Sequence, residues 1–194
     1  MNTYYLFPHK ILSTKIIDKN INPINIVSEL NDNKKKYTFT HYINNRWENI
    51  YISPQYIPSV LPFISFVISL SLKYYKNLLM PHQTLIVPHE LLGYQKNEFW
   101  FNISKPGDST RIHNHNQKAL LSGVFYLDVP KDSGNIIFKN RKKKELEIKA
   151  EIGKIIFFPP ELDHYVTINN SEGKRISISF NCYKFPILSN IDTT

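Results

Sequence analysis

The sequence has one cysteine, few arginines and no apolar run long enough to cross a membrane. Cys182 is the single cysteine among 194 residues, so no disulfide can form within the chain and a reducing compartment is expected. Met1–Lys10 shows no positively charged start followed by an apolar stretch, so no secretory signal is predicted. These absences predict a cytoplasmic protein.

Arginine is scarce even though the formal net charge is +8. Lysine supplies 20 of the 24 basic residues, and the chain also holds 26 isoleucines and 20 asparagines, which indicates an AT-rich gene more than selection for phosphate contacts. Interfaces that read bases favour arginine because its guanidinium makes paired hydrogen bonds. Nucleic-acid binding therefore stays open but is not favoured, and each of the four arginines deserves its own explanation.

The longest apolar stretch, residues 57–72, contains two prolines and four serines. It is shorter than the roughly 20 residues that a bilayer requires. Apolar residues from Ile57 to Leu79 recur at spacings of three and four, which is typical of an amphipathic helix. We predict a helix packed against a sheet, and no membrane span.

The two halves of the chain differ in their pattern of apolar residues and turn signals. Residues 1–95 mix short apolar segments, prolines and the helical pattern, whereas residues 96–185 alternate short strand patterns with turn signals. We predict a single, mainly β domain over residues 1–194 with flanking α-helices. Residues 96–185 are expected to form a double-stranded β-helix, the cupin-like jelly-roll barrel. Residues 1–95 are expected to pack on this barrel as a helical and extended region. The eight expected strands are Phe99–Ser104, Thr110–His115, Leu120–Val129, Asn135–Lys139, Glu145–Ala150, Lys154–Phe158, His164–Ile168 and Arg175–Cys182.

The strongest chemical signal is the pair His113 and His115 on one predicted strand. Alternate side chains of a strand share a face, so both imidazoles can reach one metal ion. His164 opens a later strand and is the candidate third ligand. Imidazole suits iron, zinc, copper and nickel, so the ligand type alone leaves the metal open.

Arg175 and Ser177 follow His164 on the last predicted strand and share a strand face. A guanidinium binds a carboxylate through two hydrogen bonds, and a neighbouring hydroxyl adds another. Because the surrounding residues are apolar or small, we expect a buried anion as the partner of Arg175.

In this order, the motifs resemble those of the 2-oxoglutarate/iron(II)-dependent oxygenases, and more narrowly those of a branch found largely in marine bacteria and phages. A phage origin would place the protein in the host cytoplasm. The resemblance covers about residues 96–182. Its segments are Trp100-Phe101-Asn102, Pro106-Gly107-Asp108, His113-Asn114-His115, Ser122 to Leu127, Gly153 to Pro159, His164, and Arg175 to Asn181.

The resemblance implies a dioxygenase, a hydroxylase in the usual case. It would hold Fe(II) on His113, His115 and His164, bind 2-oxoglutarate through Arg175 and Ser177, and consume O2. Oxidative decarboxylation of 2-oxoglutarate would be coupled to oxidation of a protein or small-molecule substrate. The sequence departs from the family at His115, where the usual ligand is a carboxylate. Three-histidine iron sites occur on barrels of this shape among thiol dioxygenases.

Two further residues are candidate contacts for 2-oxoglutarate, namely Asn102, which precedes the H-x-H motif, and Tyr126, whose phenol could donate to a carboxylate. Asp108 is expected in a turn, and Asp163 should face away from the metal. No role is assigned to the other histidines, and Ser122, Gly123 and Gly153 are expected to serve turns and packing. The residues assigned no role are His9, His41, His82 and His89.

Two alternatives remain at this point. A metal-dependent cupin that does not use 2-oxoglutarate, either a three-histidine dioxygenase or an isomerase, would fit the ligand set equally well. A non-enzymatic jelly-roll binding module, with incidental histidines, would fit the fold. The sequence does not give the substrate or the oligomeric state.

Overall fold

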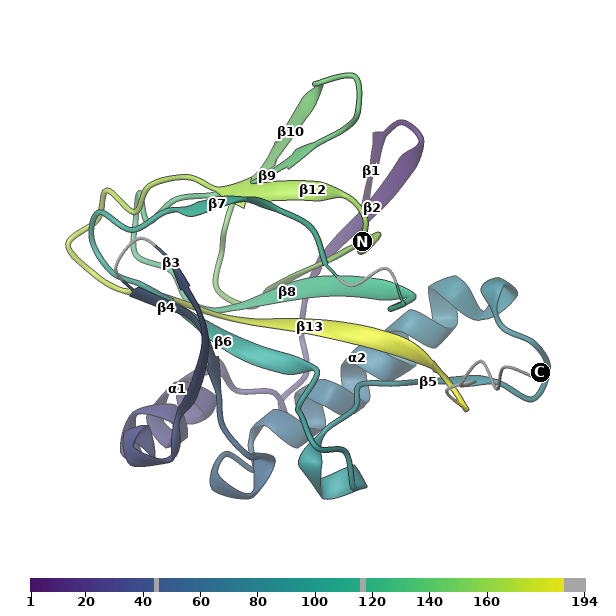
Figure 1. The fold of residues 1–194 in the computed structure, drawn as a ribbon, viewed down its shortest axis with the longest axis horizontal. Helices are drawn as coiled ribbons and strands as arrows, with labels where there is room; N and C mark the ends of the chain where they lie inside the picture. The colour runs from purple at the N-terminus through teal and green to yellow at the C-terminus, as the bar shows by residue number, and fades with distance from the viewer. Residues whose placement is uncertain (44–45, 116–117, 187–194) are drawn as a thin grey trace, which may run out of the picture.

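A computed structural model describes residues 1–43, 46–115 and 118–186. The eight strands of the second half are shared between two antiparallel sheets that face each other, and they alternate between them except for the consecutive pair β9 and β10 (Figure 1). This alternation is the pattern of a double-stranded β-helix and confirms the predicted fold class. The larger sheet takes β6 (Phe99–Ser104), β8 (Leu121–Asp128), β11 (Lys154–Phe158) and β13 (Arg175–Phe185), and the smaller sheet consists of β7 (Thr110–His113), β9 (Ile136–Lys139), β10 (Glu145–Ile148) and β12 (Asp163–Val166).

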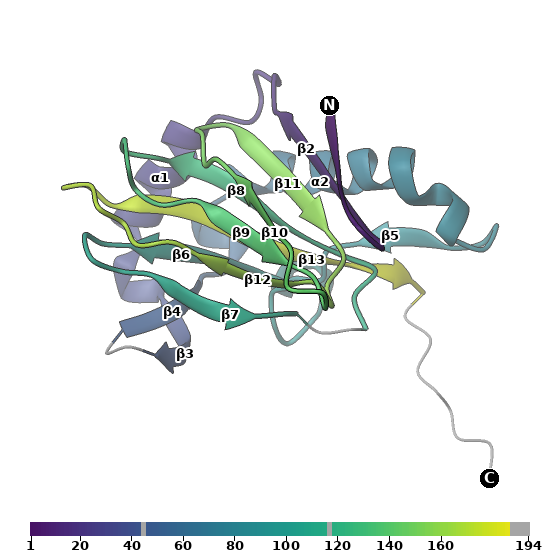
Figure 2. The same ribbon diagram turned by 90° about the horizontal axis from the view of Figure 1, so that it is seen from above.

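The two sheets form an open sandwich and not the closed barrel that the sequence led us to expect. The order of the smaller sheet is β10-β9-β12-β7, and in the described part of the chain neither of its edges pairs with the larger sheet. Each of its strands has only four residues. Such short strands cannot follow the twist of the larger sheet far enough to close a ring of hydrogen bonds, so the sheets pack face to face (Figure 2).

Strands from the first half of the chain extend the larger sheet at both edges. Its order is β1-β2-β11-β8-β13-β6-β4-β3, and β5 pairs with the end of β13. Sequence analysis did not identify these strands individually. Their bounds are β1 (Asn2–Leu6), β2 (His9–Lys15), β3 (Thr38–Ile43), β4 (Arg46–Tyr51) and β5 (Thr84–Ile86).

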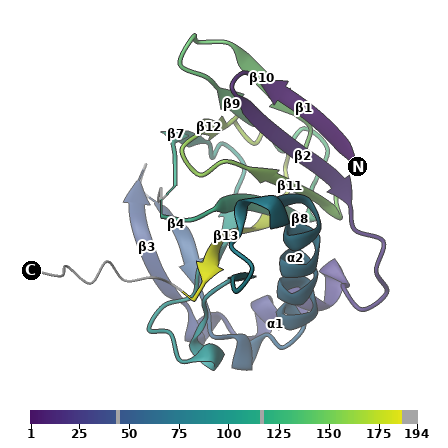
Figure 3. The same ribbon diagram turned by 90° about the vertical axis from the view of Figure 1, so that its right-hand side faces the viewer.

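Two α-helices cover the face of the larger sheet that points away from the smaller one (Figure 3). Helix α1 (Pro23–Asp32) begins where the Asn22 side chain accepts a hydrogen bond from the Ile24 N–H at 2.9 Å. Helix α2 (Val60–Tyr75) confirms the predicted helix, although Tyr75 is followed by a 3₁₀ turn. Four short 3₁₀ helices complete the description: η1 (Lys34–Lys36), η2 (Pro54–Tyr56), η3 (Lys76–Leu78) and η4 (Glu90–Leu92).

The larger sheet separates two apolar clusters. One lies under the helices, where the ring of Phe63 on α2 stacks on Phe125 of β8 with centroids 4.8 Å apart. The other lies between the sheets and includes Val124 and Tyr126, the two neighbours of Phe125 on β8. Strand alternation thus sends adjacent β8 side chains into different clusters. No helix of the described residues is long and apolar enough to span a membrane.

Candidate functional site

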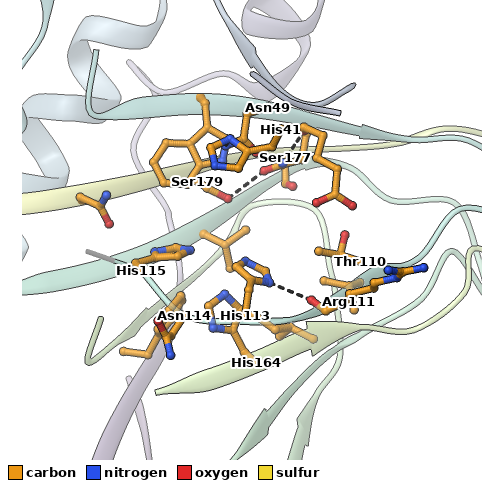
Figure 4. Close-up of a pocket in the computed structure, with 18 of the residues that line it drawn as sticks. His41, Asn49, Thr110, Arg111, His113, Asn114, His115, His164, Ser177 and Ser179 are labelled. Atoms are coloured by element: carbon orange, nitrogen blue, oxygen red, sulfur yellow. Dashed lines mark hydrogen bonds between the residues drawn. The ribbon is translucent and has the colours of Figure 1, made fainter. Parts of the chain in front are cut away.

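Three histidines meet between the sheets, at one end of a cavity (Figure 4). His113 ends β7 and lies directly opposite His164 of β12 in the strand register. Ring centroids are 4.3 Å apart for His113 and His164, and 4.9 Å apart for His115 and His164. One ligand atom from each of the three lies within 4.8 Å of the others. Among the described residues, no other group of three or more His, Cys, Asp or Glu side chains is close enough together to hold a metal ion.

Backbone carbonyls fix the orientation of two of these imidazoles. His113 Nδ1 lies 2.8 Å from the Arg111 carbonyl, and His164 Nδ1 lies 2.9 Å from the Leu162 carbonyl. A carbonyl oxygen can only accept, so each Nδ1 carries the proton and each Nε2 is left as a lone-pair donor. A hydrogen bond from the second ring nitrogen to a backbone carbonyl is typical of histidines that bind metals.

A hydrogen bond of its backbone N–H positions His115. Its N–H donates to the Pro160 carbonyl at 2.7 Å, while its Nδ1 is buried without a hydrogen-bond partner in the described structure. The adjacent Asn114 donates to Asp163 at 2.9 Å, so that carboxylate is occupied outside the histidine cluster. Asp108 accepts from the Lys105 N–H at 2.7 Å, as expected of a turn residue.

The site favours uncharged imidazoles. Burial lowers the pKa of His164 well below its usual value, and the neighbouring His113 and His115 lower it further. Burial and His113 also lower the pKa of His115 to about 4, against a hydrogen bond with Asn181 that raises it. Neutral imidazole is the form that binds a divalent metal. Oriented nitrogens, an orphaned buried Nδ1 and neutral rings together fit an iron(II) ion.

Arg175 lies in the wall of the same cavity, which has a volume of about 460 Å³. It is only 4% exposed, and its Nη1 donates to the carbonyls of Ser133 at 2.8 Å and Gly134 at 3.1 Å. Its Nε is buried and has no hydrogen-bond partner among the described residues. A buried guanidinium with an unused donor is suited to an anion.

Ser177 and Tyr126 line the cavity with Arg175 and face each other across β13 and β8. Burial raises the pKa of Tyr126 to about 12, against the lowering effect of the Arg175 charge. The phenol is therefore protonated at neutral pH and can donate a hydrogen bond. The structure thus places these three in one cavity, together with Asn102, the fourth residue predicted to bind the co-substrate.

Asn102 also lines the cavity, but its amide is already used by the protein. Its Nδ2 donates to the Glu48 carbonyl at 2.7 Å, and its Oδ1 accepts from the Ser179 hydroxyl at 2.8 Å. These bonds tie β6 to β4 and β13. They favour a role in building the wall over a direct contact with a ligand.

Sequence analysis missed several cavity residues. His41 was assigned no role, yet it lines the cavity beside Asn49 (Figure 4). Glu98 also lines the cavity, although it lies one residue before β6, where the sequence pattern gives no signal for it. Asn181, predicted only as the end of a motif, also lines the cavity.

Comparison with known proteins agrees with this geometry. Residues 98–181 match a family model described as "Putative 2OG-Fe(II) oxygenase". No curated protein shows significant sequence similarity to the chain. The narrower relationship to a bacterial and phage branch stays a prediction.

Solved structures share the fold at low sequence identity. A prolyl-4-hydroxylase from Pseudomonas putida superposes with a TM-score of 0.65 and 16% identity, over 92% of this chain and 94% of that one. The carbocyclase SnoK of nogalamycin biosynthesis gives 0.62 and 12%, over 89% and 78%. A prolyl hydroxylase from Trichoplax adhaerens, in complex with a peptide fragment of hypoxia inducible factor, gives 0.60 and 12%, over 89% and 83%.

At these identities the structural likeness shows the fold, and the family model adds the enzyme class. Over residues 98–181 the chain therefore matches the 2-oxoglutarate/iron(II)-dependent oxygenases, non-haem iron enzymes that use 2-oxoglutarate and O2 as co-substrates.

Proposed function

We propose that His113, His115 and His164 hold the iron(II) of this oxygenase, and that Arg175, Ser177 and Tyr126 receive the distal carboxylate of 2-oxoglutarate. The observation that carries the proposal is a single cavity with converging imidazole nitrogens and, in its wall, a buried guanidinium with an unused donor. When bound, the iron supplies the oxidising chemistry of the family. Hydroxylation of a protein side chain or a small molecule is the proposed outcome, in the cytoplasm.

The cavity residues position the co-substrate, supply a positive charge and limit water around the histidines. Arg175 is already fixed by two backbone carbonyls, so it loses little freedom when it binds a carboxylate. The neutral phenol of Tyr126 can donate a second hydrogen bond to the same group. Val124 and Phe158 supply an apolar part of the cavity wall that limits water near the histidines.

A second candidate function rests on the ligand set itself. Three neutral histidines leave the iron its full charge, whereas the commoner facial triad includes a carboxylate. A three-histidine oxygenase that binds its substrate directly through Arg175, without 2-oxoglutarate, would use the same residues. Coupled formation of succinate and uptake of O2 separates the two, because only the leading proposal consumes 2-oxoglutarate.

The test is an anaerobic titration of the metal-free protein with iron(II) and then 2-oxoglutarate, monitored by visible absorption. We expect a weak charge-transfer band that requires both additions. Arg175→Met should weaken 2-oxoglutarate binding at least about 30-fold, because it removes a buried charge partner. Arg141→Ala, at an exposed hairpin tip, is the matched control and should change nothing. A missing band together with unchanged affinity in Arg175→Met would overturn the proposal.

A further inference from the structure

Glu98 places a carboxylate in the wall of the histidine cavity and belongs to neither proposed binding group. Its Oε2 accepts hydrogen bonds from Asn181 at 3.0 Å and from the Tyr183 hydroxyl at 2.9 Å. These two donors fix the carboxylate in one orientation. The ion pairs found among the described residues do not include Glu98, although the chain contains 20 lysines.

Aromatic rings lie beside this carboxylate. Tyr51 and Trp100, on the neighbouring strands β4 and β6, both line the cavity with ring centroids 6.2 Å apart. Burial is the main cause that raises the pKa of Tyr51, and the negative charge of Glu98 contributes to the rise. The carboxylate and the aromatic faces can both attract a cation. Together they are a suitable site for an alkylammonium or guanidinium group.

The Glu98 region adjoins the histidines. The ring of Trp100 meets that of His115 edge-on, with centroids 5.4 Å apart. Asn181 hydrogen-bonds to Glu98 and also affects the pKa of His115. A group held by Glu98 would therefore place the atoms next to it near the metal site.

Arg175 and Asn181 lie six residues apart on β13, a distance of about 20 Å along a strand. The cavity wall thus has the Arg175 guanidinium at one end and the Glu98 carboxylate at the other. Glu48, the other carboxylate in the wall, is paired with Arg46 at 3.1 Å. If 2-oxoglutarate occupies the first end, the second is left for the molecule that is oxidised. The Glu98 carboxylate would also disfavour binding of the anionic 2-oxoglutarate at the second end.

We propose that Glu98, with Tyr51 and Trp100, forms the substrate subsite and that the primary substrate carries an alkylammonium or guanidinium group. The role of this cation as the substrate rests on the proposed function, but its binding can be measured independently. The group could belong to a free amine metabolite or to a basic side chain of a polypeptide. The chemistry recognised is the same in both cases.

The experiment compares cations with neutral molecules of the same shape by calorimetry. The probes are n-propylguanidinium against n-propylurea, free lysine against free norleucine, and the capped peptide Ala-Ala-Lys-Ala-Ala against its norleucine counterpart. Each is titrated into protein loaded with Mn(II) and 2-oxoglutarate under anaerobic conditions, and into metal-free protein. We expect at least one cation to bind about tenfold or more tightly than its neutral match. Whether free lysine or the peptide binds more tightly identifies the source.

Glu98→Gln is the test variant, since an amide oxygen can still accept from Asn181 and Tyr183 while the charge is lost. We expect it to abolish the preference for cations and to leave the binding of Mn(II) and 2-oxoglutarate unchanged. Glu147→Gln, at an exposed position of β10 in the smaller sheet, is the matched control.

The proposal is overturned if no cation is preferred over its neutral match, or if Glu98→Gln keeps the preference. Its failure is distinguishable from that of the proposed function, which would show instead as a loss of metal or 2-oxoglutarate binding by the unaltered protein.

Discussion

His113 and His164 face each other across two paired strands of the smaller sheet, with ring centroids 4.3 Å apart. Each ring donates its Nδ1 proton to the carbonyl two residues before it. The two strands therefore present a matched pair of nitrogens to the proposed metal, and the proposed third ligand, His115, lies beyond the end of β7.

His115 can be tested by exchange for the commoner ligand. We predict that His115→Asp binds iron(II) within about tenfold of the unaltered protein, whereas His115→Ala loses more than about 100-fold. The reason is that aspartate restores the usual two-histidine, one-carboxylate set. Metal affinity is measured by anaerobic titration, with His82→Ala as an exposed control. Equal affinities for the alanine variant and the unaltered protein would mean that His115 only lines the site.

The stability of the metal-free protein should depend on pH through the histidines. The pKa of His164 lies well below its usual value of 6.5 and that of His115 is about 4, so the unfolded chain takes up protons that the folded chain does not. The free energy of unfolding should therefore fall as the pH drops from 6.5 towards 4. Urea unfolding in the presence of a chelator measures the slope.

The variant His164→Gln removes the buried histidine and leaves all carboxylates unchanged. It therefore separates the histidine contribution to the pH dependence from that of the carboxylates. The variant should show a smaller loss of stability over the same pH interval. If its slope equals that of the unaltered protein, burial of a neutral His164 is not the cause.

Gly134 should be required for the position of Arg175. It has φ +87°, and an added Cβ would lie 2.4 Å from the Thr167 carbonyl oxygen and 3.1 Å from Arg175 Nη1. We predict that Gly134→Ala weakens 2-oxoglutarate binding at least about tenfold by displacing the guanidinium. Gly93 has a similar φ of +83° and open space around it, so Gly93→Ala is the matched control. Both should lose about 1–2 kcal/mol from backbone strain, but only the first should lose affinity for 2-oxoglutarate.

Gly123 should be required for packing within the larger sheet. An added Cβ would lie 2.3 Å from Phe180 Cζ and 2.7 Å from the Ile156 carbonyl oxygen. Gly123→Ala should reduce the free energy of unfolding by about 2–3 kcal/mol, measured in urea, because the core is overpacked. Adding Phe180→Leu should recover part of the loss. A neutral effect of the single change would show that the strands can move apart at no cost.

The eight core strands were predictable because clear turn residues separate short runs rich in apolar and β-branched residues. The N-terminal strands were not, since β2 carries three consecutive buried residues, Ile11 to Ser13, and shows no alternation. That pattern arises because β2 lies inside a sheet that is covered on both faces. Periodicity cannot reveal which distant strand will provide the cover.

The clustering of the three histidines and the place of Arg175 in the same cavity were predictable from strand period and spacing, because these residues lie within short motifs. Glu98 was not, since a charged residue just before a strand is usually solvated. Only the pairing of β6 with β13, which sets Glu98 beside Asn181, brings this carboxylate into the cavity.

The pairing of β2 with β11 has a practical consequence for work on the catalytic core. A fragment that starts near residue 96 would leave the hydrogen-bonding edge of β11 unpaired and the apolar face under Phe63 bare. Exposed strand edges and apolar faces recruit other chains. The part of the sequence that carries the family motifs should therefore aggregate when expressed alone, and mutagenesis is best carried out in the full-length chain.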